Sequence, residues 1–222
     1  MCARVVILIV MLSATPLFAS SSPPDRLAVR VHLEFDPSID SSTIRKVAQH
    51  EAAAIWKGYG IDLQWTDRGG RPDLSLEAVV ERDHVDPDAS LVLGHTSVSL
   101  DASGPAPIHI SFDAVNSLLR SQHGRASMPL DHEVALALGR VLAHEVGHIL
   151  LGSPAYHDPA GLMRTTFLPA DLVWGPPVSF RLTERSVERL RDRMASLALP
   201  QLPETFATAS WVAWGAPQPD IR

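Results

Sequence analysis

Residues 144 to 148 read HEVGH, an arrangement suited to binding a metal ion. On a helix, residues four positions apart lie one turn apart on the same face, so His144 and His148 can present two imidazole nitrogens to one ion. Zinc bound in this way can polarise a carbonyl group and lower the pKa of a bound water toward about 7. Glu145 is then placed to accept the proton of that water and to pass it to a leaving amine. The alternative is an amphipathic helix whose polar side chains bind nothing.

A catalytic zinc site needs a third protein ligand and an open position for water. Gly152 can end the helix in a left-handed conformation, and Pro154 prevents the helix from resuming, so the chain must turn back. The turn can bring His157 to the metal, or the adjacent Asp158 if the geometry favours a carboxylate. Glu184 is the main rival, because some zinc peptidases take a glutamate from a later helix. We predict His157 as the third ligand.

Residues 139–164 resemble the metzincin clan of zinc endopeptidases, whose pattern is HExxHxxGxxH followed by a turn that contains a methionine. The order of the motif residues matches, and they are His144, Glu145, His148, Gly152, His157 and Met163. The spacing differs, because the glycine comes one residue late and the second and third histidines are nine residues apart rather than six. The segment is more similar to a group of exported bacterial metzincin-like proteins.

The resemblance implies a zinc endopeptidase that acts on peptides or proteins. It implies that Met163 forms an apolar floor beneath the metal without binding it, and that an edge strand before the active-site helix pairs with an extended substrate. Some metzincins have an auxiliary tyrosine two residues after the methionine, but that position is Thr165 here. Whether Tyr156 or Arg164 stabilises the oxyanion is left open.

The apolar pattern predicts the elements that must position these residues. Alternation of apolar and polar residues, bounded by turn residues, predicts strands over 27–35, 61–66 and 74–81. Two more strands are expected within residues 88–112, on either side of a loop rich in glycine and proline. Helical spacing predicts three helices, an N-terminal one within 41–60, the active-site helix over 130–151, and a last helix over 180–199 with Thr183 as its N-cap.

We therefore expect an α+β fold, a single zincin-like or metzincin-like domain over residues 27–200. It would contain a twisted mixed sheet of about four to five strands, an N-terminal helix, a central active-site helix and a C-terminal helix. The chain of 222 residues, 45% hydrophobic, is long enough for one such core. A Pro-rich tail is expected over residues 201–222.

The net charge of the chain and its N-terminal segment indicate which binding partners and which cellular location to expect. The net charge is −6 and no cluster of Lys or Arg stands out, which disfavours nucleic acid or an anionic membrane as a partner. Residues 1–20 have a basic residue, an apolar run and then small residues, which is the pattern of a secretory signal peptide. A secreted or periplasmic protein, monomeric and without a membrane span after cleavage, is expected. An uncleaved N-terminal anchor is the alternative.

The leading functional hypothesis is an exported zinc metalloendopeptidase with His144, His148 and His157 as metal ligands and Glu145 as general base and acid. One alternative is a zinc-stabilised binding domain without catalytic activity. The intact Glu145 argues against it, because a structural zinc site does not need that carboxylate. The other alternative is a zinc amidase, which would apply the same chemistry to a non-protein amide.

Overall fold

The computed structural model describes residues 26–65, 72–82, 91–96, 107–123 and 130–198. The predicted signal peptide and the predicted Pro-rich tail lie outside these residues. Among the helices of the described part, none combines the length and the apolar character needed to cross a membrane.

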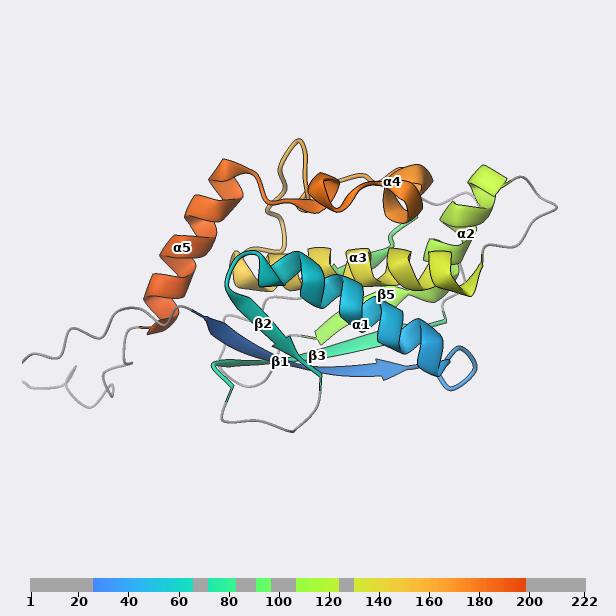
Figure 1. The fold of residues 1–222 in the computed structure, drawn as a ribbon, viewed down its shortest axis with the longest axis horizontal. Helices are drawn as coiled ribbons and strands as arrows, with labels where there is room; N and C mark the ends of the chain where they lie inside the picture. The colour runs from blue at the N-terminus through green and yellow to red at the C-terminus, as the bar shows by residue number, and fades with distance from the viewer. Residues whose placement is uncertain (1–25, 66–71, 83–90, 97–106, 124–129, 199–222) are drawn as a thin grey trace, which may run out of the picture.

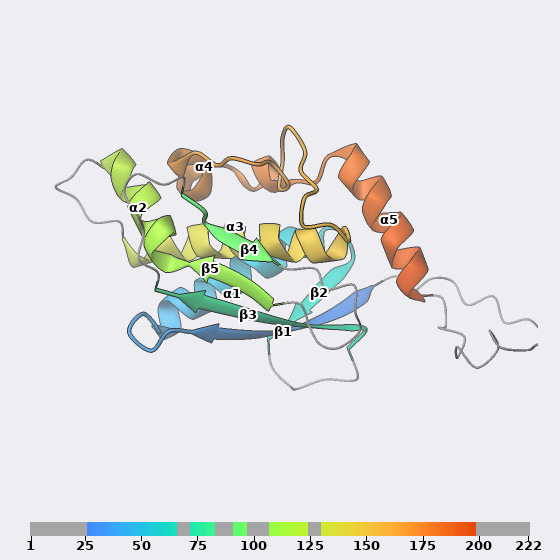
Figure 2. The same cartoon turned by 180° about the vertical axis from the view of Figure 1, so that it is seen from behind.

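A five-stranded sheet forms one layer of the molecule, with the strands in the order β2-β1-β3-β5-β4 (Figures 1 and 2). The first four strands in this order run parallel, and β4 runs antiparallel to β5 at the edge. The sheet is therefore mixed, as the sequence predicts. The strands are β1 (Leu27–Phe35), β2 (Ile61–Gln64), β3 (Leu74–Glu81), β4 (Gly94–Thr96) and β5 (Pro107–Ser111).

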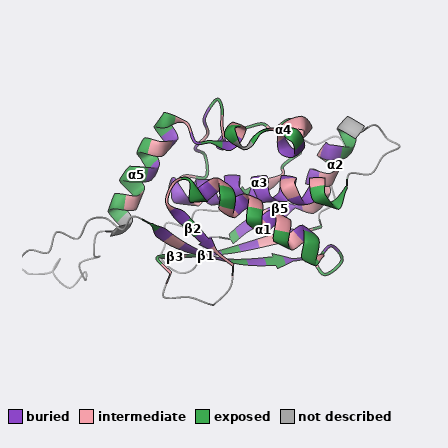
Figure 3. Ribbon diagram, in the orientation of Figure 1, coloured by how far each residue is buried: buried purple, intermediate pink, exposed green. Residues whose placement is uncertain are grey.

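Helices cover one face of this sheet. The helices α1 (Ser42–Lys57) and α3 (Asp131–Leu150) contact each other, and α1 also packs on β2 while α3 packs on β4 and β5 (Figure 1). Buried residues concentrate along α3 and on alternate positions of β1 (Figure 3). The alternation in β1 is expected for a strand in a sheet that has helices on one face only. The remaining helices are α2 (Phe112–His123), α4 (Pro169–Trp174), the 3-10 helix η1 (Pro177–Phe180) and α5 (Glu184–Ala198).

The sequence prediction missed α2, α4 and η1 and placed the start of α5 too early. The second strand expected within residues 88–112 ends at Ser111, whose hydroxyl accepts a hydrogen bond from the Ala114 amide at 3.1 Å and so caps α2. The last helix begins at Glu184 rather than at Phe180, because Phe180 belongs to η1 and is buried. The predicted cap is correct, since the Thr183 hydroxyl accepts a hydrogen bond from the Ser186 amide at 3.2 Å.

The helices α1 and α3 are in close contact at Gly139. A Cβ atom on Gly139 would lie 2.6 Å from the Ala48 carbonyl oxygen and 2.9 Å from the Glu51 Cβ. Four residues further along α3, the carbonyl of Ala143 accepts a hydrogen bond from the indole N–H of the fully buried Trp56 at 3.1 Å. These contacts fix the position of α3, the helix that carries the HEVGH motif, against α1.

Gly139→Ala should lower the free energy of unfolding by about 1–3 kcal/mol, because the added methyl group meets backbone atoms of α1 that cannot rotate away. The intrinsic helix preference for alanine over glycine, about 1 kcal/mol, acts in the opposite direction. Urea denaturation measures the difference. Gly58→Ala is the matched control, since its Cβ would have 4.0 Å to the nearest atom. Equal stability of the two variants would show that the helices are not in close contact at Gly139.

Candidate metal centre

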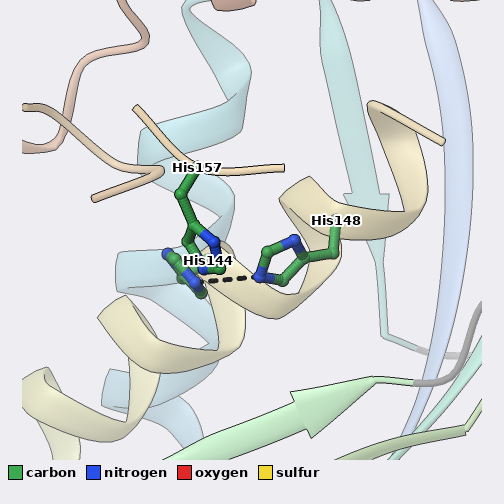
Figure 4. Close-up of side chains that lie close together, drawn as sticks. All are labelled: His144, His148 and His157. Atoms are coloured by element: carbon green, nitrogen blue, oxygen red, sulfur yellow. Dashed lines mark hydrogen bonds between the residues drawn. The ribbon is translucent and has the colours of Figure 1, made fainter. Parts of the chain in front are cut away.

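The three histidines that the sequence predicts as metal ligands come together in the structure. Their candidate ligand atoms all lie within 4.8 Å of one another, and the Nε2 atoms of His144 and His148 are 3.0 Å apart. His144 and His148 come from α3, while His157 comes from the loop that follows and approaches them from another side (Figure 4). No other group of three or more His, Cys, Asp or Glu side chains lies this close together within the described ranges.

The turn after α3 brings His157 into place. Gly152 has a φ of +69°, as predicted for a left-handed residue at the end of this helix. The Ser153 amide donates to the His148 carbonyl at 2.9 Å and the Gly152 amide donates to the Ile149 carbonyl at 3.0 Å. This pair of hydrogen bonds is a Schellman motif, which ends the helix and reverses the chain. The turn therefore explains why His157 can lie beside His148 although nine residues separate them.

Backbone carbonyls orient the two histidines of α3. The Nδ1 of His144 lies 2.7 Å from the Leu162 carbonyl oxygen, and the Nδ1 of His148 lies 3.1 Å from that of Ser153. Because a carbonyl oxygen only accepts hydrogen bonds, each Nδ1 carries the hydrogen and each Nε2 presents a lone pair. Two lone pairs that face each other at 3.0 Å suit a shared cation.

Burial keeps both histidines neutral, which is the form that binds metal. It lowers the pKa of His144 to about 4, against its ordinary value of 6.5. Burial also lowers the pKa of His148, although its bond to Ser153 acts in the opposite direction. Three imidazoles within reach of one another fit a zinc ion with one coordination position left open.

Glu145 lies beside this cluster as an unpaired buried carboxyl group. Its residue exposure is 4%, and its Oε2 has no hydrogen-bond partner among the described residues. Burial raises its pKa to about 8. A Cβ atom on Gly94 would lie only 3.0 Å from Glu145 Oε1, so the glycine of β4 makes the space for this side chain. A buried carboxyl group whose pKa is shifted in this way, in a pocket that also contains a cluster of histidines, is a candidate for proton transfer.

A pocket with a volume of about 660 Å³ opens onto the cluster. Its walls come from β4, from α3 and from the segment after Met163. Leu118 of α2, a helix that the sequence did not predict, also lines the pocket. Apart from Glu145 and the histidines, the lining side chains carry no ionisable group; they include Leu91, Leu93, Leu118, Val141 and Phe167.

Met163 is fully buried and packs against α3 at Gly147. A side chain at Gly147 would collide with the Met163 sulfur, so the glycine of HEVGH is what lets the methionine pack there. The same segment supplies the Leu162 carbonyl that orients His144. This placement is compatible with the apolar floor that the metzincin resemblance implies.

The structure brings neither rival ligand to the cluster. Glu184 is exposed at the start of α5, and Asp158 is buried but accepts hydrogen bonds from the hydroxyls of Tyr156 and Ser186. The two candidates for oxyanion stabilisation are engaged elsewhere as well. Tyr156 donates to Asp158 at 3.2 Å, and Arg164 pairs with Asp171 at 3.2 Å. Neither of them lines the pocket.

In metal-free protein, Glu145→Gln should stabilise the fold increasingly as pH rises from about 5 to about 8. Between the ordinary pKa of 4.5 and the folded-state value of about 8, the unfolded chain loses a proton that the folded chain keeps. Stability is therefore lost as pH rises through this window, and the glutamine variant escapes that loss. Thermal melts of both proteins in a chelator measure the difference. A pH-independent difference would show that the carboxyl group is not buried as described.

No protein-family model matches the chain, and no curated protein sequence matches it. Among solved structures, the chain is similar to archaemetzincin from Methanopyrus kandleri. The sequence identity is 14% and the TM-score is 0.47, and the alignment covers 79% of this chain and 99% of that chain.

Proposed function

We propose that this protein is a zinc-dependent metallopeptidase that hydrolyses peptide bonds with a water molecule activated at the metal. The observation that carries the proposal is a pocket lined by three histidines whose candidate ligand atoms lie within 4.8 Å of one another and by Glu145, whose Oε2 has no hydrogen-bond partner among the described residues. His144, His148 and His157 would hold the ion. Bound zinc would supply Lewis acidity, which makes a water acidic near neutral pH and polarises the substrate carbonyl.

Glu145 acts as the general base and then as the general acid. Its carboxylate accepts a proton from the attacking water and returns it to the nitrogen of the leaving amine. Burial favours the protonated form, and the charge of a nearby metal ion favours the ionised form. These opposed effects suit a group that must both accept and release a proton near neutral pH.

The edge strand β4 and the pocket walls support an extended peptide as the substrate. Among the described strands, β4 pairs only with β5, so its other edge is free to bind a peptide backbone. Gly94 and Thr96 of this strand line the pocket that also contains Glu145. A peptide paired with β4 would therefore pass beside the general base, with an apolar side chain in the pocket.

An open pocket also separates this proposal from a purely structural zinc site. A structural site has four protein ligands and excludes substrate, whereas this cluster has three histidines that line the pocket. A zinc amidase would use the same residues, and the substrate alone distinguishes it. We further propose that the protein acts after export, on the basis of the signal-peptide pattern in residues 1–20.

Glu145→Gln should retain one zinc per chain and lower kcat/KM for peptide hydrolysis by about 10²–10⁴-fold, because it removes proton transfer and leaves the ligands in place. Mass spectrometry of a cleaved peptide library measures the activity, and elemental analysis measures the zinc. Wild-type-like hydrolysis by the variant would contradict the mechanism. Cleavage of non-protein amides alone, with peptides left intact, would favour the amidase.

Removal of zinc by a chelator should lower the melting temperature of the wild-type protein, and one equivalent of zinc should restore it. Binding to the folded state alone stabilises it by about 2.7 kcal/mol when free zinc is 100 times Kd. His157→Ala should lose most of this stabilisation, since it leaves two ligands. If that variant and the wild-type protein respond equally to zinc, His157 is not a ligand.

A further inference from the structure

Asp158, the residue directly after His157, is a buried carboxyl group that the proposed chemistry does not use. Its residue exposure is 4%. Three hydroxyl groups donate hydrogen bonds to it, from Tyr156 at 3.2 Å and from Thr183 and Ser186. Thr183 caps α5 and Ser186 lies in its first turn, so Asp158 joins the loop after α3 to the start of the last helix.

The carboxyl group of Asp158 lies next to the N-terminus of α5, where backbone N–H groups without a partner inside the helix and the helix dipole favour an acceptor oxygen. Three hydroxyl donors on this one carboxyl group hold the loop after α3 and the first turn of α5 together.

The backbone around Asp158 is fixed as well. Its amide donates to the Met163 carbonyl at 2.8 Å, and the Leu162 amide donates to the Arg181 carbonyl at 3.0 Å. The Leu162 carbonyl in turn orients the ring of His144. The short loop from residue 158 to 163 therefore connects the start of α5 to two histidines of the cluster.

The His157 ring differs from the other two rings in how it is held. A backbone carbonyl accepts a hydrogen bond from His144 and another from His148, whereas the ring of His157 makes no hydrogen bond to a described residue. Its contacts are with the neighbouring rings, at centroid distances of 5.6 Å to His144 and 4.9 Å to His148. The position of His157 thus depends on its own backbone, and the next residue is Asp158.

We propose that Asp158 is a positioning residue, which holds His157 within reach of His144 and His148 by binding the hydroxyls of Tyr156, Thr183 and Ser186. This inference rests on the metal site of the proposed function. It assigns Asp158 an outer role in metal binding, of the kind that partners of metal ligands have in other proteins. It also gives the first turn of α5 a role in the site, although α5 supplies no ligand.

The test compares zinc affinity in wild-type protein, Asp158→Ala and Asp158→Asn at one fixed pH. Asp158→Ala should weaken zinc binding by about 10–100-fold, because outer partners of metal ligands have effects of this size. Asp158→Asn keeps one acceptor oxygen and should recover part of that loss. Competition with a chromophoric chelator measures Kd. The visible absorption of bound Co²⁺ should weaken in Asp158→Ala, since water then replaces His157.

Leu76→Ala controls for a general loss of stability, which could by itself weaken zinc binding in Asp158→Ala. It removes a buried side chain from β3, a strand that contributes no residue to the cluster. This variant should melt at a lower temperature and keep the wild-type Kd and Co²⁺ spectrum. If Asp158→Ala does not fold, Ser186→Ala and Thr183→Val each remove one hydroxyl donor and should weaken binding by a smaller factor. Wild-type zinc affinity in these variants and in Asp158→Asn would overturn the positioning role.

The same experiment separates this inference from the proposed function. If the wild-type protein binds zinc and Asp158→Ala binds it more weakly, the positioning role holds even when no peptide is cleaved. If the wild-type protein binds no zinc, both proposals are overturned. Normal peptide hydrolysis together with unchanged zinc affinity in Asp158→Ala would overturn the positioning role alone.

Discussion

The candidate metal centre depends on the orientation of two buried imidazole rings, those of His144 and His148, whose Nε2 atoms face each other at 3.0 Å. Carbonyl oxygens fix both rings through Nδ1, so the lone pairs on Nε2 converge. Burial keeps the rings neutral, and neutral rings with converging lone pairs repel each other unless a cation lies between them. A metal ion between the two rings would remove this repulsion, with His157 as the third donor in the proposed site.

The fold supports that arrangement from several sides. Gly139 and the bond from Trp56 to the Ala143 carbonyl hold α3 against α1, and Gly147 lets Met163 pack under the helix. The loop after α3 supplies both His157 of the cluster and the carbonyl that orients His144. On the open side, Gly94 of β4 leaves room for Glu145. Glycines therefore occupy the positions at which a side chain would collide with the neighbouring atoms around the site.

Local patterns in the sequence predicted much of this site. The four-residue spacing of His144 and His148 requires only helix geometry, and the left-handed turn at Gly152 follows from local backbone preference. The alternation in residues 27–35 likewise predicted β1 with its correct bounds. These features could be predicted because each depends on residues that are close together in the chain.

Other features depend on residues that are far apart in the chain, and the sequence did not predict them. The helix α2 follows β5 without a break, so its first residue was assigned to a strand, and Leu118 was missed as part of the pocket. In the sequence Asp158 is a rival ligand because it directly follows His157, and its partners Thr183 and Ser186 are 25 or more residues away and become visible only in the structure. The need for Gly94 is visible only once β4 lies beside Glu145. Only tertiary contacts define these roles.

X-ray absorption at the zinc edge of the zinc-loaded wild-type protein tests the central claim most directly. The account predicts three imidazole nitrogens and one non-imidazole oxygen, all at about 2.0–2.1 Å from the metal. A coordination shell with only two imidazoles would remove His157 from the site. Four protein ligands and no water would contradict an open catalytic centre.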